Sequence, residues 1–575
     1  MEKVSLWIRG AKVWNAYEKK FEEADVAVEK GRFCYIDRER RTFLDAERIL
    51  DAAGMYLLPG LIDIHMHIES TMMTPENLAW ALAGNGVTTI VSEPHEMANV
   101  KGMRGILEMI QAGKHVPVDI FYGIPSCVPS TSDELETAGG KIGFAEMKAL
   151  LEYPEVACVG EVMNYRGVLE EPELDICRFL SYVRKERPGL PIEGHCPELV
   201  GRELAAYLGL GIDSDHTEHS LEEVRQRIEN GMFVEIQEKM LRQEILDYLI
   251  SHKLYEHCAF VTDDTMADTL MEQGQLNHVA AKAVEMGFPL EEAVYCATYT
   301  PARRMRFFDR GTVAPGKIAD FQLVERPETF RPISVFKNGE EIWRPGRKPM
   351  IHGYAFPEDF YTSVRVPEVS PEFFRVPAPK GASFVWVRVM EVARGGTHTH
   401  EKVVKMPVQN GFVDWQGSGC LLAAVLERHG IDGSRAFGFL TGDCHKKGTI
   451  ATTYLHDHHN LLVAGDSPED MAWAVGRIRR QQGGYLAVRK KAVLAELALP
   501  VCGILSERPA EETGAALKHV RFVMRELGYE HENPIMSFAC LGLPVSPELK
   551  LTNRGLIETR ARKKVSLIIK EGERL

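Results

Sequence analysis

The sequence predicts an α/β protein, in which a (β/α)₈ TIM barrel carries a composite N-terminal β-sandwich and a C-terminal α/β (α+β) domain. Three observations predict this fold class. Eight short apolar runs alternate with helical patterns between Leu57 and Asp264. Strand-like runs stand before and after them, and a proline-rich stretch leads into a last part with its own strands and helices. Such alternation is typical of a parallel sheet or barrel.

Residues 1–56 predict a small all-β unit, because short apolar runs alternate with turns that contain Gly10 and Gly31. After the barrel the pattern returns to strands. A β-unit on each side of the barrel predicts one sandwich built from two segments. We therefore assign residues 1–56 and 306–365 to a composite β-sandwich domain.

Residues 57–305 predict the barrel itself, since repeated strand–helix units over a stretch of this length fit a closed barrel better than an open sheet. Its first helix has Thr74 as a candidate cap and Pro75 at the first helical position. The candidate strands are 57–64, 87–92, 118–123, 156–162, 190–194, 211–214, 232–237 and 259–262.

Residues 366–575 predict a C-terminal domain in which strands and helices alternate. Prolines spread over residues 345–380 indicate an extended connector in front of it. Within the domain, the apolar run Leu461–Gly465 predicts a strand, and Ser467 with Pro468 predicts the capped start of a helix.

Composition and charge exclude several classes of protein. The 575 residues carry a net charge of -14, which argues against nucleic acid or an anionic membrane as partner. The 11 cysteines form no C-x-x-C pair, so neither a disulfide framework nor a zinc ribbon is indicated. The N-terminus lacks a signal-peptide pattern, and no apolar run is long enough to span a bilayer. We therefore expect a cytoplasmic protein.

The first barrel strand ends in the pattern His65-Met66-His67. Side chains alternate between the two faces of a strand, so the two imidazoles project from the same side. Two neutral imidazoles placed in this way can bind one divalent cation. Two histidines that merely face one core are the alternative reading, and the residues at the other strand ends argue against it.

The remaining strand ends carry further histidines and carboxylates. In a (β/α)₈ barrel the C-terminal ends of all strands meet at one mouth. Nitrogen and oxygen ligands without thiolates suit zinc, iron(II) or manganese. The residues at these ends are Glu93-Pro94-His95-Glu96, Glu161, His195, His216, Gln237-Glu238 and Asp263-Asp264.

Two of these carboxylates have a specific expected role. Glu161 ends an apolar strand, where an unpaired buried carboxylate is costly unless metal ions or a salt bridge to Lys or Arg compensate it. Asp263 follows the last strand and is the natural partner for a metal-bound water, whose proton it can take and return to a leaving group.

Longer motifs resemble those of the adenine deaminase family in the amidohydrolase superfamily, over almost the whole chain. They lie at 59–70, 93–100, 160–164, 194–197, 214–216, 262–264, 314–320, 456–460 and 544–551. The resemblance implies hydrolytic deamination of adenine to hypoxanthine and ammonia, by attack of a metal-bound hydroxide on C6 of the ring. It places the chain in purine salvage with a small purine-like substrate, and we expect a homo-oligomer.

The resemblance also implies the roles of the site residues. His65, His67 and Asp263 would hold one divalent ion (Mn²⁺, Fe²⁺ or Zn²⁺), and Glu161 would bridge it to a second. Asp263 would also relay the proton of the hydroxide, and Glu96 is a second catalytic candidate. The second ion would be held by His195 and His216, and the expected substrate contacts are His95, Glu96, Glu238 and Asp264.

Several positions near the mouth depart from the family pattern. They are Glu93, where Asp is usual, Glu198, Thr217, Gln237 and Thr265. None is a proposed ligand, but a pocket that pairs with particular ring atoms discriminates sharply between analogues. Adenine remains the expected substrate, and N6-substituted adenine, guanine or a pterin are alternatives.

Glu198 is a third catalytic candidate, because His195-Cys196-Pro197-Glu198 reproduces an H-x-x-E spacing that the related cytosine deaminases use for proton transfer to the ring. The alternative is an acid favoured by the dipole at a helix N-terminus. Likewise His95 and Glu96 could instead orient ligands from outside the metal shell.

The run His456-Asp457-His458-His459 fits no zinc-finger spacing, so we expect no metal there. It would form a domain interface or line the barrel mouth. Two other functions stay open from the residues: a cyclic-amide hydrolase with the same metals, and a non-catalytic amidohydrolase-like binding protein. Complete ligand positions argue against the second.

Overall fold

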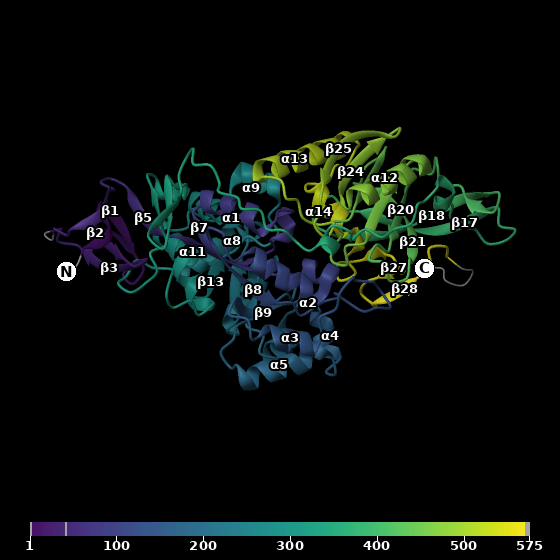
Figure 1. Ribbon diagram of the computed structural model, residues 1–575. Helices are drawn as coiled ribbons and strands as arrows, with labels where there is room; N and C mark the ends of the chain where they lie inside the picture. Colours follow the sequence, from purple (N-terminus) through teal and green to yellow (C-terminus); the bar gives the residue numbers. More distant parts are fainter. Residues whose placement is uncertain (1–2, 41–42, 570–575) are drawn as a thin grey trace.

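The structure is a computed structural model, and it describes residues 3–40 and 43–569. Figure 1 shows an N-terminal sheet at one end, a barrel with its helices in the middle, and a large C-terminal sheet with its helices at the other end. The protein therefore combines strands and helices in the order that the sequence predicts.

The N-terminal sheet has eight strands and includes segments from both sides of the barrel. Its order is β16-β15-β14-β5-β1-β2-β3, with β4 paired to β1. Strand β5 pairs antiparallel with β14, so the chain returns to this sheet after the barrel. The strands are β1 (Val4–Asn15), β2 (Lys20–Glu29), β3 (Arg32–Asp37), β4 (Ala46–Asp51), β5 (Tyr56–Pro59), β14 (Phe321–Val324), β15 (Ser334–Lys337) and β16 (Glu340–Trp343).

The predicted first barrel strand, 57–64, is wrong as one element. Strand β5 belongs to the N-terminal sheet, and the first barrel strand, β6, begins at Leu61. Gly60 lies between the two strands, and Thr88 packs against it: a Cβ there would be 2.1 Å from the Thr88 Oγ1 atom. The division of the chain into three domains stays a prediction.

Eight parallel strands form the barrel. They pair in the orders β6-β7-β8-β9-β10 and β11-β12-β13. The Asp213 N–H donates to the Ile192 carbonyl at 3.1 Å between β10 and β11, and the Asp263 N–H donates to the His65 carbonyl at 3.0 Å, which closes the ring. The strands are β6 (Leu61–Met66), β7 (Val87–Ser92), β8 (Asp119–Ile124), β9 (Val156–Val162), β10 (Ile192–Gly194), β11 (Ser214–Asp215), β12 (Phe233–Ile236) and β13 (Cys258–Phe260).

Helices surround these strands as predicted. Helix α1 begins at Pro75, but Thr74 makes no side-chain bond to the helix backbone and instead accepts the Asn77 side-chain amide at 3.1 Å. The barrel helices are α1 (Pro75–Gly84), α2 (His95–Ala112), α3 (Phe144–Leu150), α4 (Tyr165–Glu170), α5 (Asp175–Glu186), α6 (Gly201–Gly209), α7 (Leu221–Glu229), α8 (Gln243–Ser251), α9 (Ala267–Gln273), α10 (Leu276–Glu285) and α11 (Leu290–Arg304).

The C-terminal part is built on a nine-stranded sheet, in the order β19-β18-β17-β21-β20-β23-β22-β24-β25. Its strands are β17 (Phe384–Val392), β18 (Thr399–Gln409), β19 (Phe412–Val413), β20 (Leu421–Leu426), β21 (Arg435–Gly442), β22 (Thr449–Thr452), β23 (Leu461–Gly465), β24 (Gly484–Arg489) and β25 (Ala492–Ala498). A second sheet has β26 (Leu549–Thr552), β27 (Gly555–Glu558) and β28 (Lys563–Val565).

Three helices accompany these sheets: α12 (Pro468–Gln481), α13 (Ala510–Glu526) and α14 (Pro534–Ala539). The predicted strand Leu461–Gly465 and the capped helix start are confirmed, with the Ser467 Oγ accepting the Asp470 N–H at 3.3 Å. Regular alternation of strand and helix is wrong, because most of these strands are antiparallel neighbours that need no helical crossover.

The C-terminal part packs directly on the barrel. Helix α13 lies beside α9 (Figure 1), where Arg521 pairs with Asp268 at 2.6 Å. The Asn460 side chain donates to the Thr137 carbonyl of a barrel loop at 2.9 Å. One hydrophobic core runs through both parts. Among the described helices, none combines the length and apolar character that a membrane span requires.

Candidate active site

The six predicted ligands converge at the C-terminal ends of the barrel strands. The His67 Nε2 atom lies 3.3 Å from the Asp263 Oδ1 atom and 3.7 Å from the Glu161 Oε1 atom. His65 Nε2 lies 3.8 Å from the same Asp263 oxygen. The convergence follows from the strand order, because each of these residues stands on or just after a parallel strand.

Glu161 lies between the two histidine pairs. Its Oε2 atom is 2.6 Å from the His195 Nδ1 atom and 3.3 Å from the His216 Nε2 atom, while Oε1 faces His67. The rings of His65 and His216 stack with centroids 3.7 Å apart. The His95 Nδ1 atom lies 3.6 Å from Oε1, so one carboxylate contacts imidazoles that come from four different strand ends.

The donor atoms fit divalent metal ions. Within the described residues, both ring nitrogens of His65 and the Nδ1 atoms of His67 and His216 are buried without a hydrogen-bond partner. Buried polar atoms are normally paired, so these nitrogens need a partner that is not part of the chain. Several groups among the described residues have donor atoms within 4.8 Å of one another, and three of them consist of predicted ligands: His65, His67 and Glu161; Glu161, His195 and His216; His65, His216 and Asp263.

The electrostatics of the cluster also suit cations. Burial opposes ionisation of Glu161, but the charges of His195 and His216 hold the pKa of this carboxyl well below its usual range. Burial and the neighbouring His216 hold the pKa of His65 well below its usual value, which keeps this imidazole neutral. Burial lowers the pKa of His67 and of His195, but the neighbouring carboxylates outweigh burial and raise both pKa values. Metal binds to neutral imidazole and ionised carboxylate, so binding here would release protons from these two rings.

Buried side chains beneath the mouth hold the strand ends. The Asp263 backbone is left-handed (φ 56), and the preceding Thr262 is anchored by its Oγ1 atom, which donates to the Asp63 Oδ2 atom at 2.5 Å. Gln275 also bonds to Asp63. These contacts fix the turn that directs Asp263 toward His65 and His67.

His216 is held by a network that sequence reasoning missed. The preceding Asp215 binds the Arg227 Nε atom at 2.8 Å and the His219 Nε2 atom at 2.9 Å, and all three side chains are fully buried. Arg227 also donates to the Cys196 carbonyl at 2.7 Å, next to His195. The carboxylate directly before His216 was the one local sign of this network. Its cationic partner, Arg227, lies on helix α7, which follows in the chain.

A second missed group lies behind His65. The Glu235 Oε2 atom is 4.0 Å from the His65 Nδ1 atom. Glu193 accepts from the Ser214 hydroxyl at 2.6 Å and from Arg304 at 2.8 Å. Carboxylates behind metal-binding histidines commonly orient the ring, and no spacing in the sequence indicated these two.

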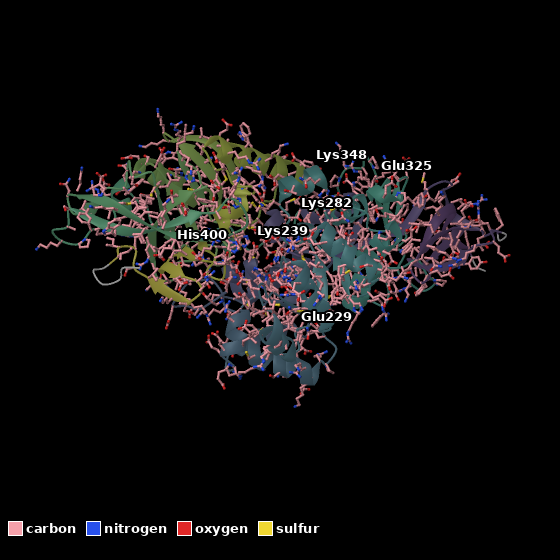
Figure 2. The ribbon with its side chains drawn as sticks, turned by 180° about the vertical axis from the view of Figure 1, so that it is seen from behind. Glu229, Lys239, Lys282, Glu325, Lys348 and His400 are labelled. Atoms are coloured by element: carbon pink, nitrogen blue, oxygen red, sulfur yellow. The ribbon has the colours of Figure 1, made fainter. Side chains whose placement is uncertain are left out.

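A cavity of about 520 Å³ opens above the cluster, within the range of small-molecule sites. Barrel residues form one wall, and the C-terminal part forms the other. Figure 2 shows Lys239 where the two parts meet. The lining includes His95, Glu96, Glu198, Thr217, Gln237, Lys239, Asp264, Gly396, Thr397, His398, His456, Asp457, Cys540, Leu543 and Val545.

Among the predicted substrate contacts, the structure brings His95, Glu96 and Asp264 to this cavity. Burial raises the pKa of Glu96 to about 8, although the charge of His456 opposes that rise. The Ser70 hydroxyl lies between two carboxylates: it bonds to Asp264 and is 3.4 Å from the Glu96 Oε1 atom.

The structure does not bring Glu238 to the cavity, which corrects that prediction. Glu238 starts a 3₁₀ turn, η2 (Glu238–Met240), and its carboxylate pairs with Lys282 at 2.7 Å and His278 at 3.2 Å on α10. The tight turn sends Glu238 outward, and the cavity receives Gln237 and Lys239 instead.

Glu198 lies at the outer rim of the cavity. Glu198 is exposed, and its backbone lies in the left-handed region (φ 67). It shares the rim with Met163 and Tyr165, and its role in proton transfer stays a prediction. Thr217 lines the cavity while its hydroxyl donates to the Asp215 Oδ1 atom at 2.9 Å.

Glu93 replaces the shorter Asp of the family pattern, and the barrel has room for it. The residue is buried below Glu161, beside Gly123 and Gly160. A Cβ at Gly160 would be 2.1 Å from the Glu93 Oε2 atom. The longer side chain is therefore accommodated by two positions without side chains.

His456 and Asp457 line the cavity, which confirms that part of the histidine-rich run borders the barrel mouth. The His456 Nδ1 atom is 3.4 Å from the Glu96 Oε1 atom, and the Asp457 Oδ1 atom is 3.9 Å from the His95 Nε2 atom. All four side chains are buried.

Comparisons with known proteins agree with these motifs. The model of the amidohydrolase family matches residues 56–342, and that of the adenine deaminase C-terminal domain matches residues 396–563. An adenine deaminase of Clostridium perfringens (strain ATCC 13124) is 44% identical over 569 residues, covering 98% of this chain and 99% of that protein.

Adenine deaminase 2 of Shouchella clausii is 45% identical over 575 residues, covering 99% of each chain. A solved structure described as an adenine deaminase is 15% identical, with a TM-score of 0.45, and the match covers 59% of this chain and 99% of that one.

Proposed function

This chain belongs to the adenine deaminase family of amidohydrolases, and we propose that its convergent histidines and carboxylates hold two divalent metal ions for that family's reaction. The reaction is the hydrolytic deamination of adenine to hypoxanthine and ammonia. The enzyme is therefore a hydrolase that acts on the C–N bond at C6. The observation that carries the metal proposal is the position of Glu161 between imidazoles from four strand ends.

The proposed ligands fall into two sets that share Glu161. His65, His67 and Asp263 would hold one ion, and His195 with His216 would hold the other. When bound, such ions lower the pKa of a water molecule in the site toward neutrality and so supply a nucleophile. Manganese, iron(II) and zinc all suit this nitrogen and oxygen set.

Asp263 is the proposed proton acceptor. Its Oδ1 atom faces His67 and His65, so it borders the place where the nucleophile would stand. It takes the proton of the attacking water and returns it to the amino group that leaves. The contact with His67 and the turn anchored by Asp63 fix its orientation.

Glu96 is the proposed acid for a ring nitrogen. It lies in the cavity wall, fully buried, where the neutral form of a carboxyl is favoured. A neutral carboxyl can donate its proton to the ring as C6 becomes tetrahedral. His95 and Asp264 border the same wall and would read the edge of the base, while Glu198 at the rim remains a second candidate acid.

We also propose a cytoplasmic compartment and a homo-oligomeric assembly. Every cysteine in the described part of the chain is a free thiol, which suits the reducing cytoplasm. The proposed role of the reaction is in purine salvage. A homo-oligomer is proposed on the general frequency of symmetric assemblies among soluble enzymes.

The test is an ammonia-release assay on protein that has been stripped of metal and reconstituted separately with Mn²⁺, Fe²⁺ or Zn²⁺. Adenine, N6-methyladenine, guanine and a pterin are offered as substrates, and metal content is measured in the same samples. We expect turnover of adenine that rises with metal content toward two ions per chain. Ammonia from guanine or a pterin with none from adenine would contradict the substrate, and full turnover without metal would contradict the metal centre.

A further inference from the structure

A short segment of the C-terminal domain reaches into the barrel and surrounds the carboxyl group of Glu96. The segment runs from Tyr454 to His459, between β22 and β23. Three of its side chains approach Glu96, although Tyr454 is 358 residues away from Glu96 along the chain. All of them are buried.

The contacts divide between the two oxygens of Glu96. The Oε1 atom is 3.4 Å from the His456 Nδ1 atom and 3.4 Å from the Tyr454 hydroxyl. The Oε2 atom is 3.7 Å from the His459 Nε2 atom. The barrel itself offers the Ser70 hydroxyl, 3.4 Å from Oε1.

One ring nitrogen of each histidine faces Glu96. The 3.7 Å separation at His459 is longer than a hydrogen bond, and neither the His459 Nε2 atom nor the Glu96 Oε2 atom has another partner among the described residues. The His459 Nδ1 atom accepts the Leu455 backbone N–H at 3.3 Å, so the ring proton stands on Nε2, the atom that faces Glu96. The His456 Nδ1 atom lies between Glu96 Oε1 and the Asp457 Oδ1 atom, at 3.4 and 3.3 Å. The Asp457 carboxylate favours a proton on this ring nitrogen.

The segment is itself held rigidly from both sides. The buried Arg428 guanidinium bonds to the His459 carbonyl and donates to the Cys502 carbonyl at 2.8 Å. On the barrel side, the Asn460 amide donates to Thr137 at 2.9 Å. A carboxyl group directed by side chains that are themselves anchored keeps one orientation.

We propose that Tyr454, His456 and His459 are positioning residues, which fix the Glu96 carboxyl against the substrate cavity. The barrel alone gives this carboxyl the Ser70 hydroxyl, which is also bonded to Asp264. A buried carboxyl with too few partners is costly and would turn toward the nearest donor. The C-terminal domain thus completes the catalytic site of the barrel. This inference rests on the proposed role of Glu96.

The test replaces each histidine in the full-length, metal-reconstituted enzyme. His459→Leu removes the donor, and His459→Gln restores an N–H close to the Nε2 position. His456→Leu likewise removes the donor at Nδ1, and His456→Asn restores one, because the Asn amide nitrogen stands close to the Nδ1 position. The matched control is His445→Leu: His445 is equally buried in this domain, and its Nε2 atom bonds to the Ala464 carbonyl at 3.1 Å.

We expect both leucine variants to lower kcat for adenine about 10- to 100-fold, with KM and metal content little changed. The Gln and Asn variants should recover most of kcat, and His445→Leu should leave it unchanged. In a Glu96→Gln background, His459→Leu should cause no further loss, because residues that act as a unit are not additive. Losses that multiply in the double variant would overturn the inference.

A crystal structure of His459→Leu gives a readout that does not depend on turnover. We expect the Glu96 carboxyl to leave its place beside Ser70, and an unchanged carboxyl would overturn the inference. If the wild-type enzyme releases no ammonia from adenine, the proposed function fails. The crystal structure of His459→Leu still shows whether the C-terminal segment holds the Glu96 carboxyl in place.

Discussion

Replacing Arg227 by Met tests whether one buried cation holds two of the proposed metal ligands. The Arg227 Nε atom binds Asp215 at 2.8 Å, and a terminal nitrogen donates to the Cys196 carbonyl at 2.7 Å. Asp215 directly precedes His216, and Cys196 directly follows His195. The guanidinium therefore ties together the ends of β10 and β11.

The expected cost follows from burial. The side chains of Arg227 and Asp215 are both fully buried. Breaking a buried ion pair by removing one partner costs about 3–5 kcal/mol of stability. His219 and Thr217 still donate to Asp215 after the change, so we expect the lower end, about 3 kcal/mol. Loosened strand ends should also weaken metal binding at His195 and His216 about 10- to 100-fold.

The assay combines urea unfolding with metal analysis at limiting metal concentration. Arg225→Met is the matched control on the same helix: Arg225 is 49% exposed and pairs with Glu229 at 3.3 Å, so its loss costs no more than about 1 kcal/mol. Figure 2 labels Glu229. If Arg227→Met unfolds at the wild-type urea concentration and retains the full metal content, the reasoning is refuted.

Three further changes test other parts of the structure. Glu161→Gln removes the charge shared by both ligand sets. We expect loss of bound metal and at least a 100-fold loss of kcat, which corresponds to an activation free energy higher by about 3 kcal/mol or more. A fully active, metal-loaded variant would contradict this. Burial lowers the pKa of His445 to about 4, so below pH 6.5 the unfolded chain takes up a proton that the folded chain refuses, and stability falls as the pH drops toward 4. His445→Gln should remove about 3 kcal/mol of that pH dependence. The free energy of unfolding is measured in urea at pH 7.5 and 4.5, and an equal loss of stability in wild type and variant would disprove the prediction. Glu238→Gln should leave kcat and KM for adenine unchanged and cost no more than about 1 kcal/mol, since its side chain is 40% exposed and faces Lys282; a large change in KM would return Glu238 to the substrate contacts.

Much of the candidate site was predictable from the sequence, for a local reason. His65, His67, Glu161, His195, His216 and Asp263 each stand at or just beyond a recognisable strand, and parallel strands in a barrel end at one mouth. Strand boundaries were also local: Val87–Ser92 and Val156–Val162 agree with the prediction to the residue. Composition and spacing were sufficient because these features depend on neighbours along the chain.

The direction of a side chain beyond the strand end depended on the tertiary structure. Glu238 and Lys239 are adjacent in sequence, but the 3₁₀ turn sends the first toward α10 and the second to the cavity. Likewise the predicted strand 57–64 is divided between two sheets, because its first residues pair with β14, a strand that follows the barrel in the chain.

The partners that tune the site are distant along the chain, and this is why only the folded structure could identify them. Glu96 is contacted by Tyr454, His456 and His459, and His216 is held through Asp215 by Arg227 on another element. No periodicity or spacing encodes such pairs, since packing of the C-terminal domain on the barrel brings them together. Chain order thus determined which of the proposed ligands meet at the mouth, whereas long-range packing decided how the proposed acid, Glu96, is oriented.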